Sequence, residues 1–197
     1  IAMLHNITIG LTELKSEWRY TYNVPESIDF MHSIINSKNR LVQESELSWI
    51  LDEFHKLDLP EMLPQGLCHS DLYYRNYFFE GNDFKALIDL DDINYTFLIF
   101  DVTELVALFK KSFKVATYKQ YGLGDEVFDF EAVTETVKRY SKYRKLSDLE
   151  KYHLYDVYKL NYLITIIWLL DYGIGDFPDS FEKRKIELLN TLGRTEF

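Results

Sequence analysis

The sequence predicts a mainly α-helical domain that carries one small β-hairpin near its middle. Apolar residues recur every three or four positions through most of the chain, as on one face of a helix. Between residues 66 and 90 this period gives way to short apolar runs around turn-forming residues. The chain has 197 residues, 47% of them apolar, which is enough for one sizeable core. We therefore expect a single domain over residues 1–197.

Two helices are predicted in the amino-terminal third. The first is expected to follow Pro25, because proline is favoured in the first turn of a helix, and its apolar positions are 28, 31, 34 and 35. The second covers about residues 43–57, with apolar positions 47, 50, 51, 54 and 57, and Pro60 and Pro64 follow it. Both read as ordinary core helices.

The hairpin prediction depends on two apolar runs, residues 77–79 and 84–88, with Glu80-Gly81-Asn82-Asp83 between them. A turn centred between Asn82 and Asp83 would pair residues whose numbers add up to 165, so that Asn76 would face Asp89. Opposed residues of antiparallel strands have Cβ atoms about 4.5 to 5.5 Å apart. That is close enough for both side chains to bind the same divalent cation.

Helical periodicity returns after the hairpin. Asp101 and Glu104 have the spacing of a capping box, which predicts a helix that begins at Asp101, with apolar positions up to 109. A loop is expected around Gly122 and Gly124, and two long helices over residues 148–171 and 181–192.

Composition excludes several classes of protein. The formal net charge of −10 disfavours nucleic-acid and anionic-membrane partners. A single cysteine, Cys68, rules out an internal disulfide and the cysteine-rich metal sites. The longest apolar stretch, residues 162–170, is too short for a bilayer span, and residues 1–5 lack the features of a secretory signal. We expect a cytoplasmic protein, and the sequence leaves its oligomeric state open.

The residues with the clearest chemical pattern are His69-Ser70-Asp71 and Asn76, followed by Ile88-Asp89 and by Phe100-Asp101. This His-x-Asp-x-x-x-x-Asn loop, with a second aspartate at the end of a hairpin, resembles the catalytic loop of protein-kinase-like phosphotransferases. The aminoglycoside phosphotransferases and choline kinases use the same spacing. The resemblance implies the carboxy-terminal lobe of a protein-kinase-like fold.

The resemblance also implies a role for each residue. Asp71 would orient the acceptor hydroxyl and take its proton, and Asn76 and Asp89 would hold Mg²⁺ on the phosphates of ATP. His69 would brace the loop through hydrogen bonds. The acceptor would be a hydroxyl of a small molecule such as an aminoglycoside, choline, homoserine or a sugar.

Structural readings of the same residues stay open. Asp71, Asn76 and Asp89 are also residue types that turns favour, and Asp91 and Asp92 either reach substrate or a second metal or lie in a solvated loop. We interpret Asp101 as structural, through its capping box. His5, His32, His55 and His153 show no metal-ligand spacing.

Other segments add weaker hypotheses. Trp168, Asp171, Tyr172 and Asp176 form either a wall for a cationic substrate or ordinary core and helix-end residues. The residues Arg144, Leu146, Ser147 and Glu150 resemble an Arg-x-Leu-Ser-x-x-Glu region of homoserine-kinase-like members.

The sequence has no glycine-rich phosphate loop. In the resembled family an amino-terminal lobe with a phosphate-binding lysine covers the nucleotide, so we expect that lobe to be missing here and the isolated chain to be inactive. The alternative function is a non-catalytic binding or regulatory module on the same fold.

Overall fold

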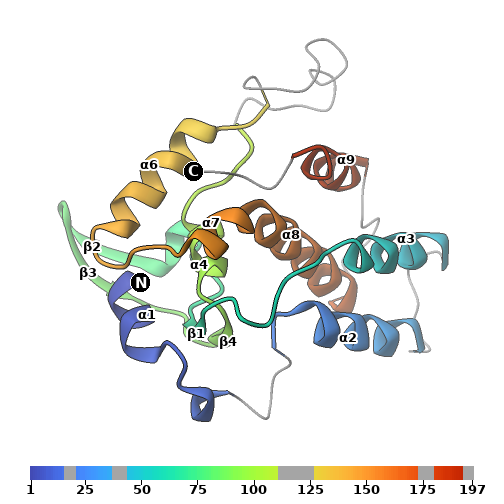
Figure 1. Ribbon diagram of the computed structural model, residues 1–197, viewed down its shortest axis with the longest axis horizontal. Coiled ribbons are helices and arrows are strands. Elements are labelled where there is room, and N and C mark those ends of the chain that lie inside the picture. Colours follow the sequence, from blue (N-terminus) through green and yellow to red (C-terminus); the bar gives the residue numbers. More distant parts are fainter. Residues whose placement is uncertain (16–20, 37–43, 111–126, 173–179, 193–197) are drawn as a thin grey trace.

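The computed structural model describes residues 1–15, 21–36, 44–110, 127–172 and 180–192, and its helices gather around one central helix, α8 (Figure 1). Helix α8 (Leu154–Asp171) packs against α2 (Val24–Asn36), α3 (Glu44–His55) and α9 (Ser180–Leu189). It also packs against α4 (Ile99–Leu105) and α7 (Asp148–Tyr152). The prediction that the chain is mainly helical is confirmed for these residues.

Helix α8 is central because it is apolar on nearly every side. Its buried residues include Leu160, Leu163 and Ile167, and a helix without a polar face is stable only inside a core. The helix predicted over residues 148–171 is in fact two helices, because α7 ends at Tyr152 and α8 begins at Leu154, with His153 between them. In the described part of the chain no helix is both long and apolar enough to span a bilayer.

The two predicted amino-terminal helices are confirmed. Pro25 is the second residue of α2, and Met31 on that helix is fully buried. On α3, Ile50 and Phe54 are also fully buried. The remaining short elements are α1 (Ala2–Thr8), the 3₁₀ turns Thr12–Leu14 and Tyr74–Asn76, and α6 (Phe130–Ser141).

The structure contains a strand pair that the sequence did not predict. Strands β1 (Gln65–Cys68) and β4 (Asn94–Phe97) run antiparallel, from the pair Gln65 and Phe97 to the pair Cys68 and Asn94. All four residues of β4 are buried, so the alternation that marks a half-exposed strand is absent. A Cβ atom on Gly66 would lie 2.8 Å from Leu98 Cδ2 and 3.0 Å from the backbone oxygen of Thr8, so a larger residue there would force Leu98 or α1 to move.

The predicted hairpin exists, but its predicted register is wrong. Strands β2 (Tyr77–Glu80) and β3 (Asp83–Leu87) are joined by Gly81 and Asn82, and Gly81 has φ +61°. A glycine with positive φ at the first loop position suits a two-residue turn. Together with an irregularity between Phe78 and Phe79, this turn makes Tyr77 pair with Leu87. The backbone oxygen of Asn76 then accepts a hydrogen bond from Ile88, and Asp89 lies one residue farther on.

The predicted capping box at Asp101 is also wrong. Helix α4 begins at Ile99 after Leu98, whose side chain makes no capping hydrogen bond, and it ends at Leu105. Phe109, which was expected to be helical, forms a β-bridge with Phe128 instead. Asp101 and Glu104 therefore lie inside the helix, and their side chains are directed to another part of the chain. The loop expected around Gly122 and Gly124 lies outside the described residues.

Candidate active site

The predicted catalytic loop lies between β1 and β2, and it turns sharply at Ser70, which has φ +63°. Asn76 is buried and its Nδ2 atom donates two hydrogen bonds to Asp71, one to Oδ2 at 2.8 Å and one to the backbone oxygen at 2.9 Å. The fold thus brings these two residues into direct contact. The carboxylate of Asp71 is held in one orientation while the residue itself remains partly accessible.

His69 uses both ring nitrogens within the loop. Its Nε2 atom lies 3.0 Å from the carbonyl oxygen of Ile88, and Nδ1 accepts a hydrogen bond from the Asp71 amide at 3.3 Å. This pattern requires the proton on Nε2. Because the ring is 1% exposed and both nitrogens are occupied, it has no nitrogen left for a substrate. These contacts suit a bracing residue, and the role of His69 in activity stays a prediction.

Asp89 follows Ile88, whose peptide is fixed on both sides. The Ile88 amide donates to the Asn76 carbonyl at 2.9 Å, and the Ile88 carbonyl accepts from His69. Asp89 itself is exposed and has φ +64°, a backbone conformation that few residues other than glycine adopt. Such strain costs about 1–3 kcal/mol and is concentrated at functional sites. Because the Ile88 amide is hydrogen-bonded to Asn76, Asp89 lies one residue beyond the position directly opposite Asn76.

The side chain of Asp101 fixes the backbone of the predicted catalytic loop through hydrogen bonds. Its Oδ2 atom accepts hydrogen bonds from the His69 amide at 2.9 Å and from His5 Nε2 at 3.1 Å, and Oδ1 accepts from the Ser70 amide at 2.9 Å. Asp101 is completely buried. The structural interpretation of this residue is retained, but it stabilises the catalytic loop and not the start of its own helix.

The Arg-x-Leu-Ser-x-x-Glu segment continues this network. Glu150 Oε1 lies 2.8 Å from Arg144 Nη2, an ion pair by distance whose angles do not make a hydrogen bond. Arg144 Nη1 donates to the Tyr140 hydroxyl at 3.3 Å, and that hydroxyl lies 2.6 Å from His5 Nδ1. Burial raises the pKa of Tyr140, so its hydroxyl keeps its proton. A buried chain of polar contacts thus runs from α7 through His5 to Asp101.

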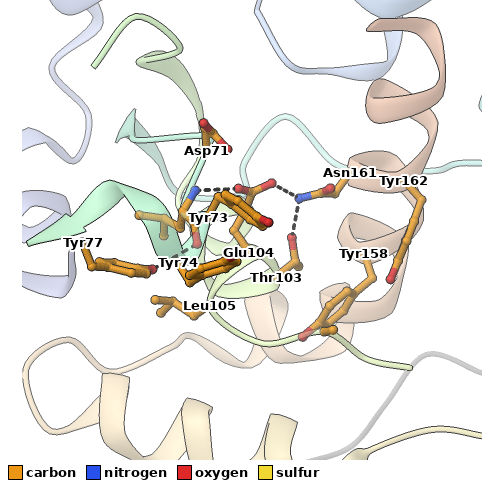
Figure 2. Close-up of a pocket in the computed structure, with 12 residues that line it drawn as sticks. Asp71, Tyr73, Tyr74, Tyr77, Thr103, Glu104, Leu105, Tyr158, Asn161 and Tyr162 are labelled. Carbon is orange, nitrogen blue, oxygen red and sulfur yellow. Dashed lines mark hydrogen bonds between the residues drawn. The ribbon is translucent and has the colours of Figure 1, made fainter. Parts of the chain in front are cut away.

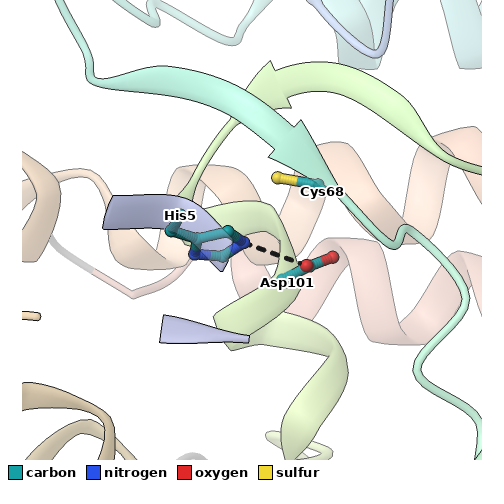
Figure 3. Close-up of side chains that lie close together, drawn as sticks. All are labelled: His5, Cys68 and Asp101. Carbon is teal, nitrogen blue, oxygen red and sulfur yellow. Dashed lines mark hydrogen bonds and ion pairs between the residues drawn. The ribbon is translucent and has the colours of Figure 1, made fainter. Parts of the chain in front are cut away.

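His5, Cys68 and Asp101 lie close enough together to resemble a metal site, with one potential ligand atom of each within 4.8 Å of the others (Figure 3). Their hydrogen bonds explain the arrangement without an ion, because the Cys68 thiol donates to the Phe97 carbonyl and both oxygens of Asp101 are occupied. Burial raises the pKa of Cys68 well above its ordinary value, which keeps the thiol protonated and makes it a poor ligand.

Glu104 lies beside the predicted catalytic loop and not at the start of its helix, where the sequence predicted it. Its Oε2 atom accepts a hydrogen bond from the Leu72 amide at 2.9 Å, and Oε1 accepts one from Asn161 Nδ2 at 2.6 Å (Figure 2). Burial, with smaller contributions from Asp101 and Asp71, raises the pKa of Glu104 to about 7. The Asp-x-x-Glu spacing was the available signal, but it was interpreted as a capping box.

Two hollows meet at Asp71, and both are also lined by Glu104 and Asn161. The first has a volume of about 400 Å³, and its tyrosines come from the loop, β2 and α8: Tyr73, Tyr74, Tyr77, Tyr158 and Tyr162 (Figure 2). The second, of about 260 Å³, is lined by Asp92 and by α8 residues that include Thr165 and Trp168. Among the described residues that line them there is no lysine, arginine or histidine.

The remaining predicted residues are distributed as follows. Asp92 lies in the second hollow with Asp71, whereas Asp91 is exposed and lines neither hollow. Trp168 lines the second hollow, and its ring centroid is 4.7 Å from that of Tyr172, which is exposed with Asp171 at the end of α8. Asp176 lies outside the described residues.

Comparison with known proteins identifies the family of this chain. The model of the phosphotransferase enzyme family matches residues 17–135, which is more than half of the chain and includes the whole catalytic loop. The chain belongs to the phosphotransferase enzyme family. The resemblance to aminoglycoside phosphotransferases is thereby confirmed at the level of the family.

Among solved structures, the chain is similar to the amicoumacin kinase hAmiN in complex with AMP-PNP, Ca²⁺ and Ami. The two chains share 16% sequence identity with a TM-score of 0.46, over 92% of this chain and 63% of the kinase. The chain therefore spans less than two thirds of the length of that enzyme. No match was found among curated proteins.

Proposed function

We propose that this phosphotransferase moves the γ-phosphoryl group of ATP to a hydroxyl of a small molecule, with Asp71 as the catalytic residue. The observation that carries the proposal is the contact between Asp71 and Asn76 beside the anchored Ile88-Asp89 segment. The Asn76 amide orients one carboxylate oxygen, which leaves the other free to accept a hydrogen bond from the acceptor hydroxyl. Asp71 then aligns that hydroxyl with the phosphate and takes its proton.

Asn76 and Asp89 have the chemistry expected of a Mg²⁺ site. Both Nδ2 hydrogen bonds of Asn76 go to Asp71, so its amide oxygen is the atom that would bind a cation, and Asp89 adds an exposed carboxylate. Oxygen ligands of these two kinds suit Mg²⁺, which neutralises charge on the nucleotide phosphates when it is bound. The observed hairpin register differs by one residue from the predicted one. This difference changes how Asn76 and Asp89 lie relative to each other, but the same two oxygen ligands remain available.

The described lining favours a neutral or cationic acceptor. Both hollows contain Asp71 and Glu104, one contains Asp92, and no basic residue is among the described ones. A substrate carboxylate or phosphate at these walls would meet like charge without compensation. Acceptors that carry hydroxyls or amines but no carboxylate therefore fit better than an amino acid such as homoserine.

A nucleotide-covering lobe is the partner that this proposal requires. The chain lacks a glycine-rich loop, and the apolar side chains next to the metal residues, Phe78 and Ile88, are 58% and 49% exposed. We propose that residues 1–197 form the metal- and acceptor-binding lobe, and that the base of ATP lies between these side chains and an amino-terminal lobe.

The test is ADP production by the full-length protein with MgATP and a panel of aminoglycosides, amino alcohols and sugars. Turnover that depends on one acceptor class would support the proposal. Binding of MgATP with no turnover of any acceptor would favour the alternative, a regulatory module.

Replacing Asp89 with asparagine is expected to raise the Mg²⁺ concentration for half-maximal activity by at least about tenfold, because a hydrogen bond or ligand contact to a charged group contributes roughly 1.5–3 kcal/mol. Activity would be titrated with Mg²⁺ after treatment with EDTA. Asp83→Asn is the matched control, since Asp83 is an exposed aspartate at the turn of the same hairpin. Equal Mg²⁺ curves for wild type and Asp89→Asn would exclude Asp89 as a ligand.

Residues 1–197 on their own are expected to show no phosphotransfer above background, because their sequence contains no glycine-rich loop that could cover the phosphates. The measurement is ADP release by the purified chain next to the full-length protein. Comparable rates for the two would refute the need for a second lobe.

A further inference from the structure

We infer that Glu104 is a positioning residue that fixes the catalytic loop to helix α8, the helix that forms the far wall of both hollows. The inference rests on the proposed function and adds a residue to it. Glu104 does not reach Asp71 by any hydrogen bond in the described chain. It acts through Leu72, the next residue along the loop.

The contacts of Glu104 give it two separate connections. Oε2 accepts from the backbone amide of Leu72 at 2.9 Å, and Oε1 accepts from Asn161 on α8 at 2.6 Å. The same Nδ2 atom of Asn161 also donates to the Thr103 hydroxyl at 3.1 Å. One carboxylate therefore joins α4, the catalytic loop and α8 (Figure 2).

The position of this bridge makes it relevant to the acceptor. Glu104 and Asn161 line the tyrosine-rich hollow and the hollow that contains Asp92, and Asp71 lines both. A substrate in either hollow would thus contact α8, the same helix to which Glu104 connects the loop. Moving α8 relative to the loop would displace Asp71 from the acceptor hydroxyl, and an error of about 1 Å can cost about 10²-fold in rate.

The ionised form of Glu104 is the one that makes both connections. Each oxygen accepts one hydrogen bond, so a proton on either oxygen weakens one of them. Asp101 and Asp71 favour the protonated form, and burial raises the pKa of Glu104 to about 7. The titratable groups that interact electrostatically with Glu104 or share a hollow with it come from every neighbouring element: Asp101 on its own helix, Cys68 on β1, Asp71, Tyr73 and Tyr74 on the loop, Tyr77 on β2, Asp92 after the hairpin, and Tyr158 and Tyr162 on α8.

The glutamine variant separates positioning from folding. Glu104→Gln keeps the shape of the side chain and one acceptor oxygen, so it resembles the protonated wild-type residue. We expect kcat of the full-length Glu104→Gln enzyme to be about tenfold below wild type at pH 8, with the acceptor KM changed less, since a hydrogen bond to a charged group contributes roughly that factor. At pH 6 the two enzymes should approach the same kcat.

The thermal stability of Glu104→Gln at pH 8 is not expected to fall together with its kcat. A carboxyl whose pKa is raised by folding favours the native state below its unfolded pKa, and this advantage is lost as the pH rises through about 7. Removing the charge should therefore leave Tm at pH 8 equal to or above that of wild type. A Tm several degrees lower, with kcat reduced equally at pH 6 and pH 8, would assign Glu104 to the fold and overturn the inference.

An amide resonance gives a test that needs no turnover. In ¹H–¹⁵N spectra the Leu72 amide should shift with pH around neutrality in the wild-type protein and should not shift in Glu104→Gln. Glu135→Gln, an exposed glutamate on α6, is the control and should leave the Leu72 titration and kcat unchanged. A Leu72 amide that does not titrate in wild type would overturn the inference, whereas an inactive wild type with a titrating amide would count only against the proposed function.

Discussion

Replacing Asp71 with asparagine should lower kcat of the full-length enzyme by about 10²–10⁴-fold, the range for a general base, with little change in stability. Asparagine has nearly the same shape and can still contact Asn76, but it cannot take the proton of the acceptor hydroxyl. The measurement is the steady-state rate of ADP formation with saturating MgATP and acceptor, next to a thermal melt. Because the loop is held through Asp101, Glu104 and His69, its backbone should not move.

The matched control for this prediction is Asp83→Asn, which changes an exposed aspartate at the hairpin turn. It should retain wild-type kcat and KM. A rate for Asp71→Asn within a factor of about three of wild type would contradict the assigned role, whatever the control shows, since general bases contribute at least about 10²-fold.

Replacing Glu150 with alanine should lower the free energy of unfolding by about 3–5 kcal/mol, the usual cost of leaving one member of a buried ion pair without its partner. Arg144 is 6% exposed and Glu150 1%, so water cannot replace the lost partner. Glu150 also accepts a hydrogen bond from the Ser147 amide in the capping box that starts α7. Denaturant unfolding would show the effect as a lower midpoint, and Tm should fall by about 10 °C.

Two further variants would test whether the loss of stability in Glu150→Ala comes from the burial of the ion pair. Glu135→Ala removes an exposed i,i+4 pair with Arg139 and should change the free energy of unfolding by no more than about 0.5 kcal/mol. The double variant Arg144→Met with Glu150→Leu removes both charges and should lose less stability than Glu150→Ala alone. Similar losses for Glu150→Ala and Glu135→Ala would show that the buried pair does not stabilise the fold.

Local periodicity was sufficient for α2, α3 and α9 and for the existence of the hairpin. Residues 28, 31, 50 and 54 fall on the faces that α2 and α3 turn toward the core, since the 3.6-residue period and burial coincide there. It was not sufficient for β1 and β4, which have four residues each and pair residues that lie between 26 (Cys68 and Asn94) and 32 (Gln65 and Phe97) positions apart in the chain. All four residues of β4 are buried, so that strand has no alternation to detect, and β1 is too short to be recognised from its own pattern.

The spacing of Asp101 and Glu104 shows why the remaining error occurred. Residues three apart in a helix can cap its start or can project side by side from its first turns, and the sequence contains nothing that separates the two. The structure decides because α4 begins two residues before Asp101, which aims both carboxylates at the amides of residues 69, 70 and 72.

The sequence by itself determined the family, helices α2, α3 and α9, and the choice of Asp71, Asn76 and Asp89 as candidate site residues, because these depend on residue type and on spacing along the chain. Only the tertiary structure decided the hairpin register, the burial of Asp101 and the bridge from Glu104 to α8. Each of these depends on contacts between distant segments, where a shift of one residue changes the partner of every side chain.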